Sequence, residues 1–337
     1  MLPGVTIIFP RYRRPAVATG LRERRLTPRM GATNDVPDDP SYRAMTIRLI
    51  LNGKAAGEPS LREAVEAERT RGSDLEVRVT WEQGDAARYA SEAVADGARI
   101  IVAGGGDGTL NEVVQGVLRS EAAFDGSIGV IPRGTANDFA SAMGIPEDPG
   151  AALAVAIRGR SMPIDVGQAG SRFFVNMALA GRGTDIGADT PEVLKKAFGR
   201  LSYLVAGITH AGEIQATEAS LRAPEFDWKG TCLLIAVANS RQVGGVQLFP
   251  DAEVDDGLLD IAILPAERTP NRISLLADYV TGGVATSLES ALVRHRAPTL
   301  TLTSSASFDV SLDGEPVRVS EIEFKLRERC LGFQLPP

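Results

Sequence analysis

The sequence predicts an α/β chain of two domains: an N-terminal doubly wound, mostly parallel sheet and a mainly antiparallel C-terminal β-sandwich or barrel. Three observations support this prediction. From about residue 46 to 168, short apolar segments alternate with amphipathic ones, which is typical of βαβ units. After about residue 170, segments rich in β-branched residues alternate with period two. The 337 residues, 44% of them hydrophobic, are enough to fill two cores.

The elements of the first half follow from local patterns. Apolar residues with a period of 3.6 predict helices, and short continuous apolar runs such as "ARIIVAG" predict strands buried on both faces. Ser60 is a candidate N-cap for the first helix, and Gly72 lies just after the end of that helix. The expected strands are 46–53, 75–81, 98–104, 127–132 and 161–168, and the expected helices are 60–72, 84–97, 110–120, 136–144 and 150–159.

The second half is predicted to consist mainly of strands, with two helices at 191–212 and 271–283. We therefore divide the chain into a first domain, 45–168, and a second, 169–337, whose last strand is free to return to the first domain. Cys232 and Cys330 are expected to be free, buried thiols. Strands are expected at 231–240, 257–264, 299–304, 307–317 and 320–326.

Residues 1–44 differ from the rest of the chain. The first 43 residues hold eight Arg and four acidic residues without sustained periodicity, which predicts a disordered extension or a start assigned too early, with Met45 as the alternative. The net charge of the whole chain is −7, so the remainder is strongly acidic, which argues against a nucleic-acid partner. No apolar run is long enough to span a bilayer and no signal peptide is evident, so we expect a cytoplasmic protein.

A glycine-rich segment, "VAGGGDGTLNEV", joins a buried strand to a helix. Glycines at the carboxyl end of a parallel strand allow backbone N–H groups to approach phosphate oxygens, and the helix that follows offers its N-terminus to the same anion. Asp107 would repel a phosphate unless it binds a Mg²⁺ ion or anchors a neighbouring loop. The alternative is a glycine-rich turn in which Asp107 caps the helix.

One strand later, "GVIPRGTANDFA" repeats the pattern of strand, glycine and helix start. Asn137 and Asp138 could simply cap the helix. Because the carboxyl ends of adjacent parallel strands meet at one edge of the sheet, the two loops should converge on one ligand. Arg133 precedes the "GT" pair and should either contact phosphate or lie at the rim of the site.

Together these two motifs resemble the diacylglycerol-kinase catalytic domain superfamily. The similarity continues through "LILNGK", "VTWEQGDAARYA", "VNMALAGRGTDI", "LFPDAEVDDGLLDI" and "LDGEP", and these motifs are similar to those of YegS-type bacterial lipid kinases. The resemblance covers roughly residues 46–335. It implies an ATP-dependent kinase with a diacylglycerol- or phosphatidylglycerol-like acceptor, which acts transiently at the membrane surface.

The resemblance also implies roles for individual residues. Glu315 of "LDGEP" would accept the proton of the lipid hydroxyl, with Asp313 as its rival. Asp256 and the carbonyl groups of Glu253 and Leu258 would hold Mg²⁺, or Ca²⁺ at the same place, although D-D-G is also ordinary turn chemistry. Nucleotide contacts are implied for Thr80, Gly106, Asp107, Gly108, Thr109, Leu110, Asn111, Glu112 and Thr135.

Two other functions stay open on the sequence. A small-molecule kinase similar to NAD kinase shares the "GGDG" element but would need substrate motifs that the sequence does not show. A non-catalytic nucleotide-binding regulator would have no reason to retain Asp107, Asp256 and Glu315 together. The sequence predicts neither the identity of the lipid nor the oligomeric state.

Overall fold

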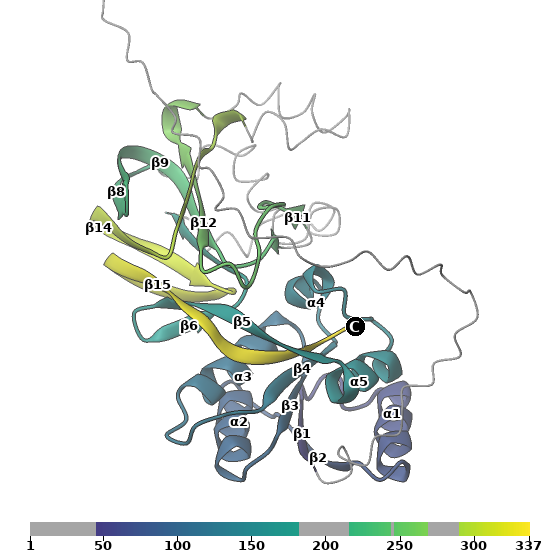
Figure 1. Cartoon of the computed structure of the whole chain (residues 1–337). Coiled ribbons are helices and arrows are strands. Elements are labelled where there is room, and N and C mark those ends of the chain that lie inside the picture. Colours follow the sequence, from purple (N-terminus) through teal and green to yellow (C-terminus); the bar gives the residue numbers. More distant parts are fainter. Residues whose placement is uncertain (1–44, 182–215, 244–245, 269–289) are drawn as a thin grey trace, which may run out of the picture. The chain divides into compact units, whose positions relative to one another are not determined.

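The computed structural model describes residues 45–181, 216–243, 246–268 and 290–337 (Figure 1). All of them lie within one compact unit, residues 39–337. The N-terminal extension and the helices expected at 191–212 and 271–283 lie outside the described residues. No helix in the described ranges has the length and apolar character needed to cross a bilayer.

The first lobe is a parallel sheet, as the alternating pattern predicts, and its strands lie in the order β2-β1-β3-β4. Its central strands β3 and β4 are buried along their whole length, which explains their continuous apolar sequences. Helices α1 and α5 contact one another on one face, while α2 and α3 pair on the other (Figure 1). The strands are β1 (Thr46–Leu51), β2 (Asp74–Val79), β3 (Ile100–Gly105) and β4 (Ser127–Pro132). The helices are α1 (Pro59–Thr70), α2 (Asp85–Ala95), α3 (Asp107–Leu118), α4 (Asp138–Ala142) and α5 (Pro149–Arg158).

The start of α1 differs from the prediction. Ser60 is not the N-cap, because the helix begins at Pro59 and Glu58 occupies the N-cap position. Proline is favourable at the first helical position, since its fixed φ suits the helix and its missing N–H would have no partner there. The end of the helix agrees with the sequence, because Gly72 follows it with a φ of 95°.

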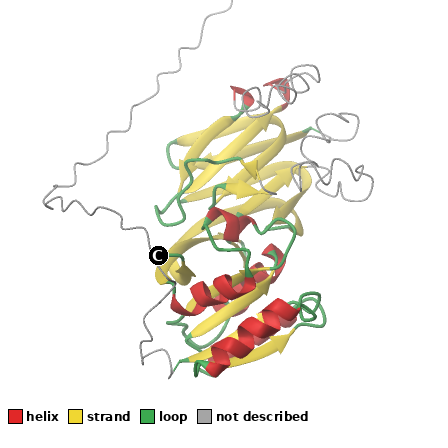
Figure 2. Cartoon of the chain, turned by 90° about the vertical axis from the view of Figure 1, so that its right-hand side faces the viewer, coloured by secondary structure: helices red, strands yellow, loops and turns green. Residues whose placement is uncertain are grey.

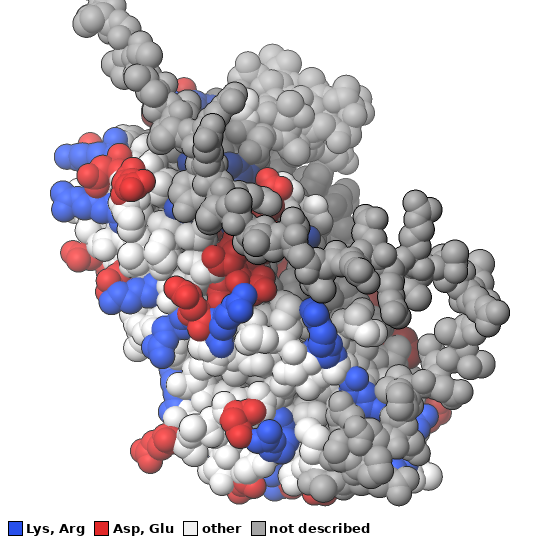
Figure 3. Space-filling view, viewed as in Figure 1, with Lys and Arg blue, Asp and Glu red and all other residues white. Residues whose placement is uncertain are grey.

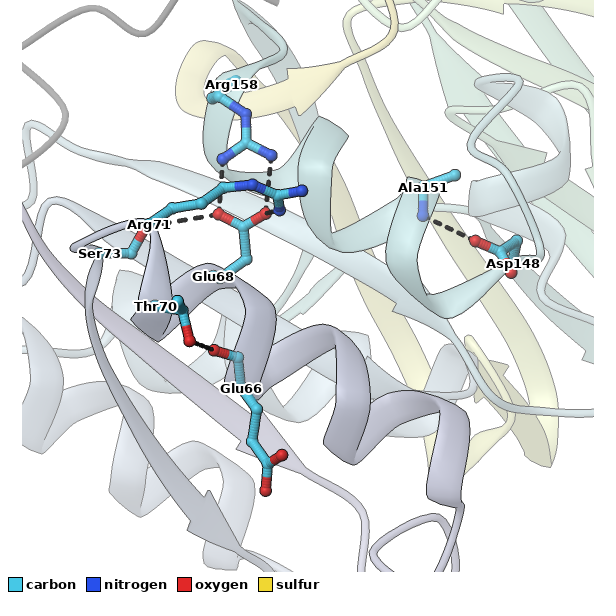
Figure 4. Close-up of polar contacts among 8 residues, drawn as sticks. All are labelled: Glu66, Glu68, Thr70, Arg71, Ser73, Asp148, Ala151 and Arg158. Atoms are coloured by element: carbon cyan, nitrogen blue, oxygen red, sulfur yellow. Dashed lines mark hydrogen bonds and ion pairs between the residues drawn. The ribbon is translucent and has the colours of Figure 1, made fainter.

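A buried ion pair joins α1 to α5. Glu68 is 2% exposed, and its carboxylate oxygens lie 2.6 and 2.8 Å from the two terminal nitrogens of Arg158. Figure 4 shows Arg71 reaching the same carboxylate, at 2.6 Å. Burial raises the pKa of Glu68, but Arg158 and then Arg71 lower it more, so the net pKa is below its usual value. At the other end of α5, the Asp148 carboxylate accepts a hydrogen bond from Ala151 N and caps the helix.

The second lobe is built from antiparallel strands, as its β-branched sequence predicts. In Figure 2 these strands lie above the helices of the first lobe. The main path runs β13-β12-β9-β7-β14-β15, with β8 pairing with both β9 and β14, and β5 pairing with β6 and β15. The strands are β5 (Arg160–Ala169), β6 (Arg172–Phe174), β7 (Met177–Gly181), β8 (Thr217–Ala223), β9 (Phe226–Ala238), β10 (Gln242–Val243), β11 (Val246–Gln247), β12 (Leu259–Pro265), β13 (Val293–Ala297), β14 (Thr299–Leu312) and β15 (Glu315–Leu335), with a short 3-10 helix, η2 (Ala266–Arg268), after β12.

The last strand links the two lobes. β15 pairs with β14 over its first half and with β5 over its second half. Near its end it also pairs in parallel with β4, with Gly332 beside Ser127. Each lobe has its own hydrophobic core, and β15 contributes buried residues to both cores. Cys232 is buried, Cys330 is half-buried, and both are free thiols.

Candidate active site

The described residues form a pocket at the carboxyl edge of the parallel sheet. Its empty volume is about 170 Å³, and its lining includes Gly106, Asp107, Leu110, Pro132 and Asn137. These residues come from the ends of β3 and β4 and from the helix starts that follow, which is where ligands bind in open parallel sheets. The structure thus brings the two glycine-containing loops together.

Glycines allow the two loops to touch. A Cβ atom on Gly106 would lie 2.9 Å from the Cα of Gly134, and one on Gly134 would lie 2.5 Å from the Cα of Gly106. Any side chain at either position would therefore push the loops apart. Gly108 is different, because an added Cβ there meets no protein atom within 4 Å. Packing within the protein does not require glycine at 108, whereas a ligand seated over the start of α3 would.

Asp107 is the first residue of α3, not a loop residue as the sequence pattern suggested. Its Oδ1 lies 3.4 Å from Phe139 N and 3.4 Å from Asn176 Nδ2. The carboxylate is therefore placed among the α3 start, the α4 start and the segment before β7. This arrangement agrees with an anchoring role for Asp107 and leaves the backbone N–H groups of the first turn of α3 for an anion.

Several side chains of the predicted phosphate segment point into the protein. Thr109 is 7% exposed and its hydroxyl accepts a hydrogen bond from Asn52 Nδ2 at 3.2 Å. Leu110 is buried in the core and lines the pocket. Glu112 Oε2 accepts hydrogen bonds from the backbone N–H groups of Gly84 and Ala86 at the start of α2. A nucleotide would thus meet mainly the backbone of this segment.

The other predicted nucleotide contacts lie at the same edge of the sheet. Thr80 directly follows β2, and its hydroxyl accepts a hydrogen bond from Gly53 N at 3.3 Å. Thr135 is exposed in the loop after β4. Arg133 does not point to the pocket: its guanidinium pairs with Glu58 at 3.1 Å and donates to the carbonyl of Glu147. Of the two roles open to Arg133, the position at the rim is the one observed.

The turn between β14 and β15 is a two-residue hairpin loop. Leu312 pairs with Glu315, and the loop residues Asp313 and Gly314 both have positive φ, at 47° and 98°. Asp-Gly is favoured in such turns because both positions need left-handed backbone conformations. The predicted turn is confirmed. Asp313 lies in its loop, whereas Glu315 is the first residue of β15.

Asp313 is the centre of a buried network. Its Oδ1 accepts hydrogen bonds from Asn176 N at 3.0 Å and Met177 N at 2.9 Å, and its Oδ2 from Val175 N at 2.7 Å and Asn111 Nδ2 at 2.9 Å. Burial raises the pKa of Asp313 to about 6, against the lowering effect of these donors. Asp313 is 8% exposed, and its hydrogen bonds join the two lobes. Its carboxylate is buried, whereas the carboxylate of Glu315 is only half-buried.

Glu315 is half-buried beside the first lobe. Its Oε2 accepts a hydrogen bond from Gln83 Nε2 at 3.2 Å, and Gln83 belongs to the loop that also carries Thr80. The pKa of Glu112 is raised, first by burial and also by the nearby negative charge of Glu315. The structure thus brings Glu315 next to the segments predicted to bind the nucleotide.

The carboxylate among the predicted cation ligands, that of Asp256, is already engaged. Asp256 Oδ1 accepts a hydrogen bond from Leu258 N at 3.0 Å, while its Oδ2 pairs with Arg296. Arg296 also contacts Asp260 at 3.0 Å. The oxygen donors at this turn are of the kind that Mg²⁺ prefers, but as folded the carboxylate does not fit a cation unless Arg296 is displaced. Among the described residues, no group of three or more His, Cys, Asp or Glu side chains is arranged for a metal ion.

Three residues at the site were not predicted from the residue types. Asn176 Nδ2 donates to Asp107, and Asn176 Oδ1 accepts a hydrogen bond from Ser240 Oγ at 3.1 Å. Asn176 therefore bridges the pocket and the second lobe. Gln83 contacts Glu315, and Asn52 contacts Thr109. All three lie in motifs that carry the resemblance, "LILNGK", "VTWEQGDAARYA" and "VNMALAGRGTDI", and that membership was the signal that could have identified them.

Two family models match the chain. The diacylglycerol kinase catalytic domain matches residues 46–169, and the YegS C-terminal NAD kinase beta sandwich-like domain matches residues 180–332. The first range covers the parallel-sheet lobe, and the second covers most of the antiparallel lobe.

Curated relatives cover most of the chain. A protein of Pseudomonas aeruginosa named "Probable lipid kinase YegS-like" is 43% identical over 291 residues, which are 86% of this chain and 94% of the relative. A protein of Pseudomonas putida with the same name is 44% identical over 289 residues, with the same two shares. The crystal structure of a diacylglycerol kinase from Bacillus anthracis has a TM-score of 0.71 at 23% identity and covers 87% of this chain and 97% of that one, which shows a common fold.

Proposed function

Because this chain belongs to the family that joins a diacylglycerol kinase catalytic domain to a YegS-type C-terminal domain, and is a kinase, we propose that it transfers the γ-phosphoryl group of ATP to a lipid hydroxyl group. The acceptor would be a diacylglycerol- or phosphatidylglycerol-like alcohol. The relatives named as lipid kinases support the lipid acceptor.

The nucleotide would lie along the carboxyl edge of the parallel sheet. Its phosphates would bind the N–H groups at the start of α3, where Gly108 leaves space for them and Gly106 allows the two loops to lie close together. Thr80 and Thr135 flank this position at the ends of β2 and β4. Asp107 would hold the loops in register through its contacts with α4 and Asn176.

Glu315 would accept the proton. As the lipid oxygen forms its bond to the γ-phosphorus, the bond from that phosphorus to the bridging oxygen breaks, ADP leaves, and the hydroxyl proton passes to the Glu315 carboxylate. The observation that carries this assignment is the contrast within the hairpin. All of the hydrogen bonds of Asp313 join it to the interior of the protein, whereas Glu315 is accessible and lies beside the loop that carries Thr80.

A divalent cation would accompany ATP. Bound to the phosphates, Mg²⁺ would neutralise part of the charge that develops during transfer. We assign no step to the turn at Asp256, because Arg296 holds that carboxylate. The function of this turn in the folded chain is to fix β12 and β13 through the Asp256–Arg296–Asp260 group.

A small-molecule kinase is the alternative. The second family model is described as similar to the NAD kinase β-sandwich, so the fold of this lobe alone does not separate the two functions. The 43% identity to a named lipid kinase over most of both chains favours the lipid acceptor.

The test is a phosphoryl-transfer assay of the full chain. Labelled ATP would be offered with diacylglycerol, phosphatidylglycerol and a ceramide-like alcohol in mixed micelles, and with NAD as the soluble alternative. We expect label in a lipid product and none in a product of NAD. Label in the NAD product alone would refute the proposal. The Glu315→Gln variant serves as the control for contaminating kinases.

A further inference from the structure

The loop after β2, which contacts the proposed proton acceptor through Gln83, also presents an exposed tryptophan. Among the described residues, two large apolar side chains are exposed, and both belong to this segment: Val79 at 45% and Trp81 at 95%. Elsewhere in the described chain large apolar side chains are at least partly covered. An indole that contacts almost no protein gives nothing to the folding core, so its position calls for a ligand or a surface.

The backbone around Trp81 is held firmly. Asp85 Oδ2 accepts hydrogen bonds from Trp81 N at 2.8 Å and Glu82 N at 3.2 Å. Thr80 N donates to the Leu51 carbonyl at 2.9 Å, and Glu112 fixes Gly84. Hydrogen bonds therefore hold four backbone N–H groups of this loop, those of residues 80, 81, 82 and 84. The indole is exposed on a backbone that is fixed in this way.

The anchoring carboxylate is charged at neutral pH. The hydrogen bond from Trp81 N, then Arg88 and the hydrogen bond from Glu82 N, lower the pKa of Asp85 to about 2. Thr80 turns its hydroxyl toward Gly53. Val79 ends β2 and Trp81 lies in the loop after it, and both side chains are exposed.

The same loop contacts the hairpin of the second lobe. Gln83 Nε2 lies 3.2 Å from Glu315 Oε2, and Gln83 is two residues from Trp81. Two residues of chain span at most about 7 Å. A lipid hydroxyl delivered to Glu315 would thus come from a bilayer whose surface is within reach of Trp81.

We propose that Trp81, with Val79 beside it, inserts into the interfacial layer of the lipid bilayer and seats the active site against the membrane. This inference rests on the proposed lipid acceptor. Tryptophan suits the layer between headgroups and acyl chains, where its ring is apolar and its N–H remains hydrated. The chain carries a net charge of −7, and Figure 3 shows basic side chains interspersed with acidic ones on the face it draws, so anionic headgroups would add little and an apolar contact is the effective means of attachment.

Adenine stacking is the competing role for this indole. A side chain that serves as a platform for a base normally packs its other face against the protein. At 95% exposure, Trp81 has neither face packed. The bilayer, which surrounds an inserted ring on all sides, fits the observed exposure better.

The test uses the fluorescence of Trp81. The chain holds two tryptophans, and Trp228 is half-buried against the core of the second lobe, so Trp228→Phe leaves Trp81 as the sole tryptophan, which is excited at wavelengths where tyrosine absorbs little. This variant would be titrated with phosphatidylcholine vesicles, with and without added phosphatidylglycerol, and separately with ATP. We expect the emission to shift to shorter wavelength with both kinds of vesicle and to stay unchanged with ATP. A shift with ATP and none with vesicles would make Trp81 a base platform, and no shift with either would also overturn the proposal.

A second measurement separates binding from chemistry. Co-sedimentation with the same vesicles should weaken by about tenfold in Trp81→Ala, because one large apolar side chain no longer leaves water, and by less in Trp81→Phe. The melting temperature should stay near that of the wild type, since the side chain contacts little protein. Wild-type vesicle binding by Trp81→Ala would refute the inference.

Turnover distinguishes this inference from the proposed function. We expect Trp81→Ala to lose turnover with a lipid in vesicles and to keep it with a short-chain, monomeric lipid alcohol. Equal losses with both acceptors would contradict a membrane role. If no lipid is phosphorylated by the wild type, the proposed function fails, while vesicle binding still measures what Trp81 does.

Discussion

The side-chain amide of Asn111, in the middle of the first lobe, donates a hydrogen bond to Asp313 of the β14–β15 turn, with Nδ2 2.9 Å from Oδ2. Both groups are buried, at 4% and 8% exposure. The same amide nitrogen also lies 3.1 Å from the Phe173 carbonyl. Asn111 therefore connects α3 with two parts of the second lobe, and it fixes the turn that carries Glu315 relative to the nucleotide segment.

Removing this amide should loosen the connection. In Asn111→Ala the Asp313 carboxylate loses one of its four donors, so we expect the free energy of unfolding to fall by about 1–3 kcal/mol and turnover to decrease. Thermal unfolding and a turnover assay measure both. Gln115→Ala is the comparison, since Gln115 Nε2 donates to the Phe173 carbonyl at 2.6 Å and to Asn111 Oδ1 at 3.2 Å but does not touch Asp313. Asp313 keeps all its donors in that variant, so an equal loss of turnover there would show that the contact with Asp313 has no special part.

The Glu68–Arg158 pair predicts a dependence of stability on pH. The pKa of Glu68 is lowered below its ordinary value of 4.5 in the folded chain. The stabilisation is therefore fully present above pH 4.5 and is lost as pH falls through the lowered folded value. Breaking the pair in Glu68→Gln should cost about 3 kcal/mol near neutral pH, because Arg158 is left largely buried.

Arg71 provides the control for this pair. It contacts the same carboxylate but is 59% exposed, so Arg71→Ala should cost at most about 1 kcal/mol. Denaturant unfolding at several pH values compares the three proteins. The wild type should lose stability relative to Glu68→Gln only as the solution becomes acidic. Parallel curves at all pH values would contradict the assignment.

The sequence predicted the architecture because apolar periodicity is a local property. The alternation of buried strands with amphipathic helices identified the parallel lobe, and the Asp313-Gly314 pair identified a hairpin turn that the structure confirms. The N-cap of α1 was misplaced by two residues, from Glu58 to Ser60, because serine is a favoured N-cap while proline suits the first helical position that Pro59 occupies.

The site was predictable only in part, because side-chain direction depends on contacts between the lobes. Asp313 and Glu315 are two residues apart and were expected to share one side of an extended strand. The left-handed backbone of Asp313 and Gly314 ends that alternation, so one carboxylate is buried and the other remains accessible. Likewise, nothing near Asp256 in the sequence indicated that Arg296, forty residues later, would neutralise it.

The turn at Asp256 predicts a response to Mg²⁺ that depends on Arg296. A ligand that binds only the folded state raises the melting temperature. Since Arg296 occupies the carboxylate, we expect Mg²⁺ to change the melting temperature of the wild type little and that of Arg296→Ala clearly upward. The double variant with Asp256→Ala should lose this response. A rise in the wild type that disappears in Asp256→Ala would instead restore the cation site expected from the sequence.

Asp107 should matter for turnover more than for stability. Its hydrogen bonds to Phe139 N and Asn176 Nδ2 are long, at 3.4 Å each, so we expect Asp107→Ala to lose turnover with every lipid and to lose much less in melting temperature. Asp148→Ala is the opposite case. Asp148 caps α5 away from the pocket, so its loss should cost about 1 kcal/mol of stability and leave turnover intact. Near wild-type turnover in Asp107→Ala would show that the glycine-rich loop is not part of the active site.

Glu315→Gln should separate chemistry from nucleotide binding. The substitution keeps the size of the side chain and its contact with Gln83 but removes the ability to accept a proton. We expect turnover at saturating lipid to fall roughly 10²–10⁴-fold, the usual contribution of a general base. ATP affinity should change little, because the group acts on the lipid hydroxyl. Glu321→Gln, at an exposed position of the same strand, is the matched control and should behave as the wild type.

The same experiment decides between the two carboxylates of the hairpin. Asp313→Asn should destabilise the fold, because an amide nitrogen would face a hydrogen-bond donor wherever it lies. Its turnover is therefore compared below the melting temperature measured for that variant. Should folded Asp313→Asn lose all turnover while Glu315→Gln retains it, Asp313 is the base and the buried network must open during the reaction. If neither variant loses turnover, the proton leaves without help from this hairpin, and Asp107 is the carboxylate to test next.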